Sequence, residues 1–228
     1  DQQIQTFYLP LLHRLSSGEW FTSRTSAALL FASVYEKIPL SMRADVHSMF
    51  VSLCTDETPM VRRAAARDMS ALVKRMSPEV IINEMLPLYR RLSADDQDSV
   101  RLLTVQNLVA MAEVLSPAET QQLLLSSICG AFQDKSWRVR YMAADNFVQL
   151  ATAVGEDVVK EDLVPAYINL MRDAEAEVRT AAATQLPGLA KLLDQNTIIE
   201  RLLPVAKELA DDPSQHVRGA LAAQVLSL

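Results

Sequence analysis

The chain has 228 residues, half of them apolar, and a net charge of −6 with a pI near 5.1. Such an acidic chain lacks the basic stripe of a nucleic-acid-binding surface, so we expect no nucleic-acid partner. No apolar run approaches the ~18–20 residues that cross a membrane, so we expect no membrane span. Cys54 and Cys129 belong to no metal or redox motif, and lone thiols of this kind suit a cytoplasmic or nuclear location.

A short pattern recurs six times along the chain: an Asp, then an Arg six residues later with Val before it, then an Ala-rich segment. The clearest copy is DKSWRVRYMAAD at 134–145. A period of 38 or 39 residues is the signature of a stacked repeat array. The first copy has Gly18 in place of Asp and Ser23 in place of Val. The anchoring arginines are Arg24, Arg62, Arg101, Arg140, Arg179 and Arg218.

The repeat predicts an all-α fold, a right-handed α-α superhelix (solenoid) of six units in a single array over residues 1–228. The expected units are about 1–38, 39–77, 78–116, 117–155, 156–194 and 195–228. Asp1 and Leu228 fall inside expected helices, which predicts that the sequence is a fragment of a longer array.

Each unit reads as two helices joined by a turn. In the third unit Ser77-Pro78 predicts the start of the first helix, because Pro suits the first helical position. The second helix should end before Ser116, which with Glu119 predicts a capping box for the next unit. When the six copies are aligned on the anchoring arginine, apolar residues recur at one position of the first helix and at three positions of the second, and we expect these columns to be buried. The column of the first helix is Leu15, Leu53, Leu92, Ala131, Leu170 and Leu209. The columns of the second helix are Ala28, Ala66, Val105, Ala144, Ala183 and Ala222; Phe31, Met69, Leu108, Phe147, Leu186 and Val225; and Val34, Leu72, Met111, Leu150, Leu189 and Leu228.

Prolines mark two further features of the helices. A Pro stands fourteen residues before four of the anchors, at Pro10, Pro87, Pro165 and Pro204. Interior Pro removes a hydrogen bond, so a kink is expected in each first helix, as in HEAT repeats. Pro187-Gly188 falls inside the second helix of the fifth unit, where the other copies have residues such as Val148 and Leu226, and predicts a bend there.

The sequence shows no catalytic constellation. It contains no phosphate-binding glycine loop, paired-cysteine motif or nucleophile elbow. His13, His47 and His216 are scattered, so we expect no metal, no cofactor and no enzymatic activity. The recurring Asp and Arg columns are interpreted as scaffold, since a charge present in every unit serves something that every unit needs.

The turn before each anchor departs from the consensus in a way that predicts a protein-binding ridge. Trp, Phe, Pro and Met are unusual at a turn tip, which has no core of its own to fill. Aromatic and arginine side chains together are typical of interface hot spots. The residues of the predicted ridge are Trp20, Phe21, Pro59, Met60, Arg63, Trp137 and Arg138. The alternative is that the aromatic side chains fold back onto the adjacent helix.

At these turns the chain is similar to the scaffolding (A) subunit of protein phosphatase 2A. The resemblance rests on WFTSRTSA at 20–27, DETPMVRRAAA at 56–66, DQDSVRLL at 96–103 and DKSWRVRYMAAD at 134–145, and continues through KEDLVPA, EAEVRTAAA and QHVRGALA. It implies a fragment covering roughly the fourth to ninth repeats, in which turns bind interchangeable regulatory (B-type) subunits. The repeats that bind the catalytic subunit would be absent. The contacts implied by the resemblance are Trp20, Phe21, Pro59, Met60, Arg62, Arg63, Asp98, Ser136, Trp137, Arg138 and Tyr141.

The function expected from the sequence is therefore a non-catalytic scaffold of a serine/threonine phosphatase holoenzyme. A HEAT-repeat transport or adaptor protein would instead bind cargo on its concave helices. A HEAT-like enzyme would need a polar pocket of converging titratable groups, and is the less expected alternative.

Overall fold

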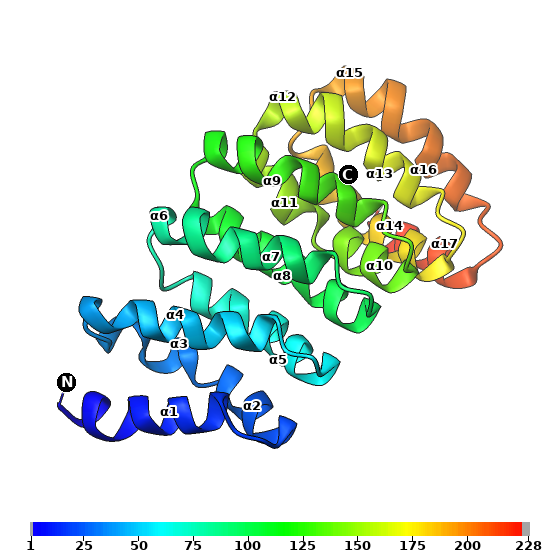
Figure 1. The fold of residues 1–228 in the computed structure, drawn as a ribbon. Helices are drawn as coiled ribbons and strands as arrows, with labels where there is room; N and C mark the ends of the chain where they lie inside the picture. The colour runs from blue at the N-terminus through cyan, green and yellow to red at the C-terminus, as the bar shows by residue number, and fades with distance from the viewer. Residues whose placement is uncertain (1, 225–228) are drawn as a thin grey trace. The chain divides into compact units, whose positions relative to one another are not determined.

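The computed structural model describes residues 2–224, and these fold into helices joined by short turns, with no β-strand among them (Figure 1). They form two compact units, one up to Val114 and one from Leu115 onward. This division falls beside the boundary expected between the third and fourth repeats. No helix of residues 2–224 is long and apolar enough to cross a membrane.

The first unit contains successive pairs of helices. Its elements are η1 (Ile4–Tyr8), α1 (Leu9–Ser16), α2 (Phe21–Ala28), α3 (Phe31–Val34), η2 (Tyr35–Lys37), α4 (Leu40–Cys54), α5 (Pro59–Val73), α6 (Pro78–Val80), η3 (Ile81–Met85), α7 (Leu86–Ser93) and α8 (Asp98–Val114). The first helices pack in the order α1, α4, α7, and the second helices in the order α2, α5, α8.

The second unit repeats this plan. Its elements are α9 (Pro117–Phe132), α10 (Trp137–Asp145), α11 (Phe147–Val154), α12 (Glu156–Val158), η4 (Val159–Leu163), α13 (Val164–Met171), α14 (Ala176–Ala190), α15 (Gln195–Thr197), η5 (Ile198–Leu202), α16 (Leu203–Ala210) and α17 (Gln215–Gln224). Here α9, α13 and α16 pack in sequence, as do α10, α14 and α17. The all-α helical-repeat class is confirmed, while the count of six repeats stays a prediction.

The predicted buried columns form the core of each unit. Most of their members are buried, namely Leu53, Leu92, Leu170, Leu209, Ala28, Ala66, Val105, Ala144, Ala183, Phe31, Met69, Leu108, Phe147, Leu186, Leu72, Met111, Leu150 and Leu189. Leu15, Ala131 and Val34 are only half-buried. Ala222 is exposed, because no described helix packs beyond α17. Val225, Leu226 and Leu228 lie outside the described residues.

The recurring prolines act through a widened helical turn. In four first helices a π-helical segment of five residues ends just before the Pro-bearing α-helix. The N–H of Leu86, for example, donates to the carbonyl of Ile81, five residues earlier. Since Pro lacks an N–H and its ring conflicts with the carbonyl four residues back, the wider turn accommodates Pro87. The first helices without this Pro, α4 and α9, run for 15 and 16 residues without interruption.

Two second helices are broken where the sequence predicts continuity. One break separates α2 from α3 at Leu29 and Leu30, and the Leu30 carbonyl accepts a hydrogen bond from the Tyr8 hydroxyl at 2.8 Å. The other separates α10 from α11 at Asn146, whose side-chain amide donates to the Met142 carbonyl at 2.8 Å. Side chains thus satisfy carbonyls near both breaks, and neither break is marked by Pro or Gly.

By contrast, α14 continues through Pro187 and Gly188. A bend at Pro187 stays a prediction, but the helix does not end there. Gly188 has a packing reason: a Cβ added to it would lie 2.8 Å and 3.1 Å from the two methyl carbons of Val148. Helix α11, which carries Val148, packs against α14. The glycine therefore permits a close approach of these two helices.

We expect Gly188→Ala to destabilise the protein by about 1–3 kcal/mol, because the new methyl group overpacks against Val148. Rotating the Val148 side chain does not relieve the clash, since both of its methyl carbons lie close to the new Cβ. Chemical unfolding measures the change. Gly130→Ala is the matched control, since a Cβ there meets nothing within 4 Å and Ala is favoured over Gly in a helix by about 0.5–1 kcal/mol. Equal effects of the two substitutions, or no rescue of Gly188→Ala by Val148→Ala, would contradict this account.

Candidate protein-binding site

Four of the turns between paired helices are held by an arginine from the preceding repeat. In the first unit the Arg24 guanidinium donates through Nε to Asp56 Oδ2 at 2.6 Å and through Nη2 to Oδ1 at 3.1 Å. Arg62 makes the same pair of bonds to Asp95, at 2.5 and 3.1 Å. These rungs join α2 to the turn before α5, and α5 to the turn before α8. We call the series the Asp–Arg ladder.

The second unit carries two further rungs with the same geometry. Arg140 binds Asp173 at 2.6 and 2.9 Å, and Arg179 binds Asp212 at 2.7 and 2.9 Å. In all four rungs the aspartate side chain is only 6–9% exposed. Bidentate arginine–carboxylate pairs are among the strong hydrogen-bonded contacts of proteins. These rungs agree with the interpretation of the recurring Asp and Arg columns as scaffold.

Each ladder residue also organises its own turn. The third guanidinium nitrogen of Arg62, Nη1, donates to the carbonyls of Asp56 and Glu57 within its own repeat. Asp56 Oδ1 accepts from the N–H of Thr58 at 2.8 Å, two residues on. The same Asp-to-N–H bond recurs at Asp95, Asp134, Asp173 and Asp212. The ladder therefore fixes both the turn and the joint between layers.

The ladder carboxylates are held ionised. Burial opposes ionisation of Asp56, but the hydrogen bonds from Arg24 and from the Thr58 N–H outweigh it and lower its pKa below the ordinary value. The pKa values of Asp95 and Asp173 are lowered by the same balance. For Asp212 the bond from Arg179 is the largest influence, and its pKa is also lowered.

The turn tips of the first unit present apolar side chains to solvent. Trp20 is 72% exposed, Phe21 44% and Met60 51%. Pro59 and Arg63 are exposed beside Met60. Because α2 packs on α5 and the Arg24–Asp56 rung ties their turns, these tips lie on adjacent layers along one edge of the unit (Figure 1). The structure thus brings five of the predicted contact residues together, and folding back is excluded for Trp20.

Two predicted contacts of the first unit differ from the rest. The Arg62 guanidinium lies in the ladder, with its side chain 19% exposed. Asp98 is half-buried at the first position of α8. Arg62 therefore positions the tip residues, and its neighbour Arg63 is the one that faces solvent.

In the second unit the predicted contacts occupy one turn and the start of α10. Ser136 is the N-cap residue of α10. The Arg138 guanidinium carbon lies 4.9 Å from the centroid of the Trp137 ring, a cation–π distance. Trp137 is half-buried, whereas Arg138 and Tyr141 are exposed. The Trp137 side chain is thus partly covered. It is neither fully exposed, as expected for a binding ridge, nor fully folded back onto the adjacent helix, as the alternative predicts.

A buried polar cluster in the first unit was not predicted from the sequence. The Tyr35 hydroxyl lies 2.7 Å from His47 Nε2, and His47 Nδ1 pairs with Glu84. The Arg43 guanidinium lies 4.8 Å from the Tyr35 ring centroid. Tyr35, His47 and Glu84 come from η2, α4 and η3, so the cluster links successive layers. No repeat period marks it, since these three residues occupy unrelated positions of their repeats.

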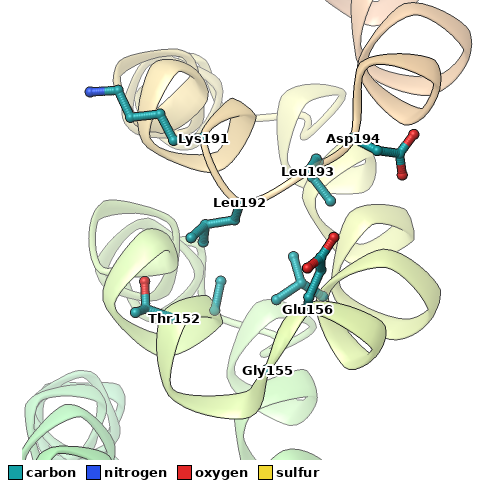
Figure 2. A pocket seen from close by; sticks show the side chains of 9 residues that line it. Thr152, Gly155, Glu156, Lys191, Leu192, Leu193 and Asp194 are labelled. Carbon is teal, nitrogen blue, oxygen red and sulfur yellow. The ribbon is translucent and has the colours of Figure 1, made fainter.

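A cavity of about 300 Å³ in the second unit lies between the segments around Gly155 and Leu192 (Figure 2). Asp194 caps α15 and pairs with Lys160 at 2.9 Å, and Figure 2 shows Lys191 and Asp194 pointing away from each other. Among residues 2–224 no group of three or more His, Cys, Asp and Glu could hold a metal ion.

Family models match the second unit. Residues 156–228 match the model for PPP2R1A-like HEAT repeats, and residues 124–154 match the model for HEAT repeats. The predicted capping box of Ser116 and Glu119, which precedes these repeats, is present at the start of α9.

Three relatives illustrate the sequence similarity. A Caenorhabditis elegans probable serine/threonine-protein phosphatase PP2A regulatory subunit is 43% identical over 79 residues, which are 35% of this chain and 13% of that protein. The Dictyostelium discoideum protein phosphatase 2A scaffold subunit is 44% identical over 82 residues, 36% of this chain and 14% of that protein. The Drosophila melanogaster serine/threonine-protein phosphatase PP2A 65 kDa regulatory subunit is 44% identical over 80 residues, 35% of this chain and 14% of that protein.

Solved structures agree on the fold. Cex1p matches with a TM-score of 0.72 at 18% identity over 97% of this chain and 42% of that chain. A designed armadillo repeat protein, YIII(Dq)4CqI, matches with a TM-score of 0.57 at 18% identity over 96% of this chain and 99% of that chain. Identities this low support the helical-repeat fold alone.

The chain is thus an α-helical repeat protein, and its residues 124–154 and 156–228 match models of HEAT repeats. It resembles the scaffolding subunits of protein phosphatase 2A, as the turn motifs predict. The matched segments are a small part of those relatives' length. The relatives are named as scaffold or regulatory subunits, in agreement with the expectation of a non-enzymatic protein.

We expect Arg140→Ala to lower the free energy of unfolding by about 1–3 kcal/mol, because the nearly buried Asp173 carboxylate loses its bidentate donor. Arg172→Ala is the control: Arg172 also makes a bidentate pair, with Glu208, but both side chains are half exposed, and we expect little change. Thermal and urea unfolding compare the two. An Arg140 variant as stable as the wild type that has lost partner binding would reverse the assignment of the ladder to stability.

We expect the protein to lose stability as the pH falls below about 4. A carboxyl with a lowered folded-state pKa contributes stability above its unfolded pKa of about 3.9, and that contribution disappears as the pH falls through the lower folded value. Urea unfolding between pH 6 and pH 2.5 measures this loss. Asp95→Asn should be less stable at pH 6 and show a flatter pH dependence, whereas parallel curves for the two proteins would show that Asp95 is not responsible.

Proposed function

We propose that the chain is part of a non-catalytic scaffold of a protein phosphatase 2A holoenzyme and binds a regulatory (B-type) subunit through its turn tips. The observation that carries the proposal is the exposure of Trp20, Phe21 and Met60 on adjacent layers of the first unit. Large apolar side chains at a tip gain nothing from the protein's own core. An interface that removes them from water would gain about 25 cal/mol per Å² of apolar area.

The tips are also suited to a specific partner by their rigidity. Arg24 binds two carbonyls of the turn before Trp20, and Arg24 and Arg62 together hold the turn before Met60. Little ordering of the backbone is therefore needed when a partner binds. Acidic residues flank the apolar tips, with Glu19 beside Trp20 and Glu57 before Pro59, and both are exposed. We therefore expect the partner to present apolar side chains flanked by Lys or Arg. The catalytic subunit would bind elsewhere in the full-length protein.

The mechanism of such a scaffold is geometric. When one array holds both the catalytic subunit of the phosphatase and the regulatory subunit that selects substrates, each is present at a high effective concentration for the other. The scaffold itself then needs no chemistry. The tip of the second unit, with Arg138 over Trp137, is a further candidate for binding in the proposed assembly. The proposed location is the cytoplasm or the nucleus.

We expect Trp20→Ala, Met60→Ala and Trp137→Ala each to weaken binding of a purified B-type regulatory subunit. A desolvated hot-spot side chain contributes at least about 2 kcal/mol, or about thirtyfold in Kd. Arg63→Ala should act in the same direction. The measurement is calorimetric titration, with circular dichroism and melting curves to show that each variant folds.

Leu40→Ala is the matched control for these variants. Leu40 is 79% exposed, more than Trp20, Phe21 or Met60, but it begins α4 and lies at the opposite end of the helix from the turn before α5. We expect its substitution to leave affinity unchanged. Tip variants that bind like the wild type, or a Leu40 variant that is equally weakened, would contradict the assignment of the site to the turns.

A further inference from the structure

Thr58 combines features that the scaffold function leaves unexplained. It is half-buried at the tip between α4 and α5 and is followed directly by Pro59, which is exposed. Its backbone is extended, with φ −84° and ψ 117°. A Thr-Pro pair in an extended segment at the surface is the form of substrate that proline-directed protein kinases accept.

The hydroxyl of Thr58 faces a guanidinium. Arg24 Nη2 lies 3.4 Å from Thr58 Oγ1, while Nε and Nη2 of the same arginine bind the Asp56 carboxylate. Arg62 donates to the backbone carbonyl of Glu57, the residue before Thr58. Arginine is the side chain best suited to bind phosphate oxygens in a fork.

We propose that Thr58 is a phosphorylation site and that its phosphate is recognised by Arg24. In the modifying step the Thr58 Oγ1 attacks the γ-phosphorus of ATP; the new O–P bond forms as the bond to the leaving ADP breaks, and the hydroxyl proton passes to a base of the kinase. The product carries a charge of about −1.5 to −2 at pH 7 and three strong acceptor oxygens.

The new charge changes the rung that holds this turn. Asp56 Oδ1 accepts the N–H of residue 58, so the phosphate and the Asp56 carboxylate would lie close together. Since like charges repel, the phosphate competes with Asp56 for Arg24. Arg24 still links the two layers, but through the phosphate.

The modification also alters the tip. Met60, 51% exposed, lies two residues from Thr58. A partner that buries Met60 would have to remove water from the adjacent phosphate, which is unfavourable without a matching cation. Phosphorylation is therefore expected to weaken such a partner's binding; this consequence rests on the proposed function, whereas the modification itself does not.

The chain contains matched comparisons. Ser77-Pro78 and Ser116-Pro117 also stand at the starts of helices in extended backbone. The Ser116 hydroxyl donates to the Glu119 carboxylate at 2.7 Å, so a phosphate there would face a negative charge. No described arginine bonds to the Ser77 hydroxyl, which makes no capping hydrogen bond. Thr58 is thus distinguished from both by its arginine.

The test treats the whole folded chain with a mitogen-activated, proline-directed kinase and Mg-ATP, and locates phosphate by mass spectrometry. We expect modification mainly at Thr58, retained in Thr58→Ser and Ser116→Ala and lost in Thr58→Ala. Predominant labelling of Ser77 or Ser116, or a Thr58 that stays unmodified while a peptide of residues 52–64 is modified, would overturn the proposal.

Two further readouts test the recognition and its consequence. Phosphorus NMR should show that the phosphate loses its last proton at lower pH in the wild type than in Arg24→Gln; identical titrations would exclude recognition by Arg24. Binding of a B-type subunit should weaken at least tenfold on phosphorylation, and unchanged affinity would exclude a regulatory role for the phosphate. Failure of the unmodified chain to bind that subunit would instead contradict the proposed function, and the labelling result would stand.

Discussion

The structure depends on one contact: an arginine of one repeat donating two hydrogen bonds to an aspartate that is nearly buried in the next. A carboxylate withdrawn from water is unfavourable unless it is paired and fully hydrogen-bonded. Asp95 meets that condition, because Arg62 and the N–H of Gln97 satisfy its oxygens. The same guanidinium binds carbonyls of its own turn, so one side chain sets both the shape of a turn and its attachment to the next layer.

Within each turn, the residues that stabilise the joint between layers are different from the residues that would bind a partner. The ladder residues face inward and have their polar atoms occupied, whereas the residues between them, such as Trp20 and Met60, are free to vary without loss of the joint. A solenoid is stabilised by its repeats and by the interfaces between neighbouring repeats. Tip residues stabilise neither a repeat nor an interface between repeats, so they can carry a binding function with little loss of folding stability.

The period of the sequence made most of the fold predictable, because buried columns and ladder positions recur at a fixed spacing. Phe31, Met69 and Leu108 are buried as the alignment predicts, and the box of Ser116 and Glu119 is formed. Features that do not follow from the repeated pattern escaped this reasoning. The breaks at Leu30 and Asn146 share one repeat position, six residues after the anchor, but different bonds are made at them, from the Tyr8 hydroxyl to Leu30 and from Asn146 to Met142. The cluster around His47 joins positions that no repeat relates. The tip residues could be chosen because they depart from the repeat, but their exposure could not be predicted. Trp20 is 72% exposed, whereas Trp137 is half-buried, with the Arg138 guanidinium 4.9 Å from the centroid of its ring.

Proline shows how the same residue can have opposite consequences in neighbouring helices. Pro87 follows a π-helical turn, in which the carbonyl of Ile81 bonds to Leu86, so the ring meets no α-helical carbonyl in its way. Pro187 lies in a helix that continues, and the glycine after it lets α14 approach Val148 closely. The first solution widens a helix and recurs in four repeats, while the second tightens a contact and occurs once. The local sequence shows where a helix contains Pro, but whether the helix widens there or packs closely on its neighbour depends on the adjacent layer.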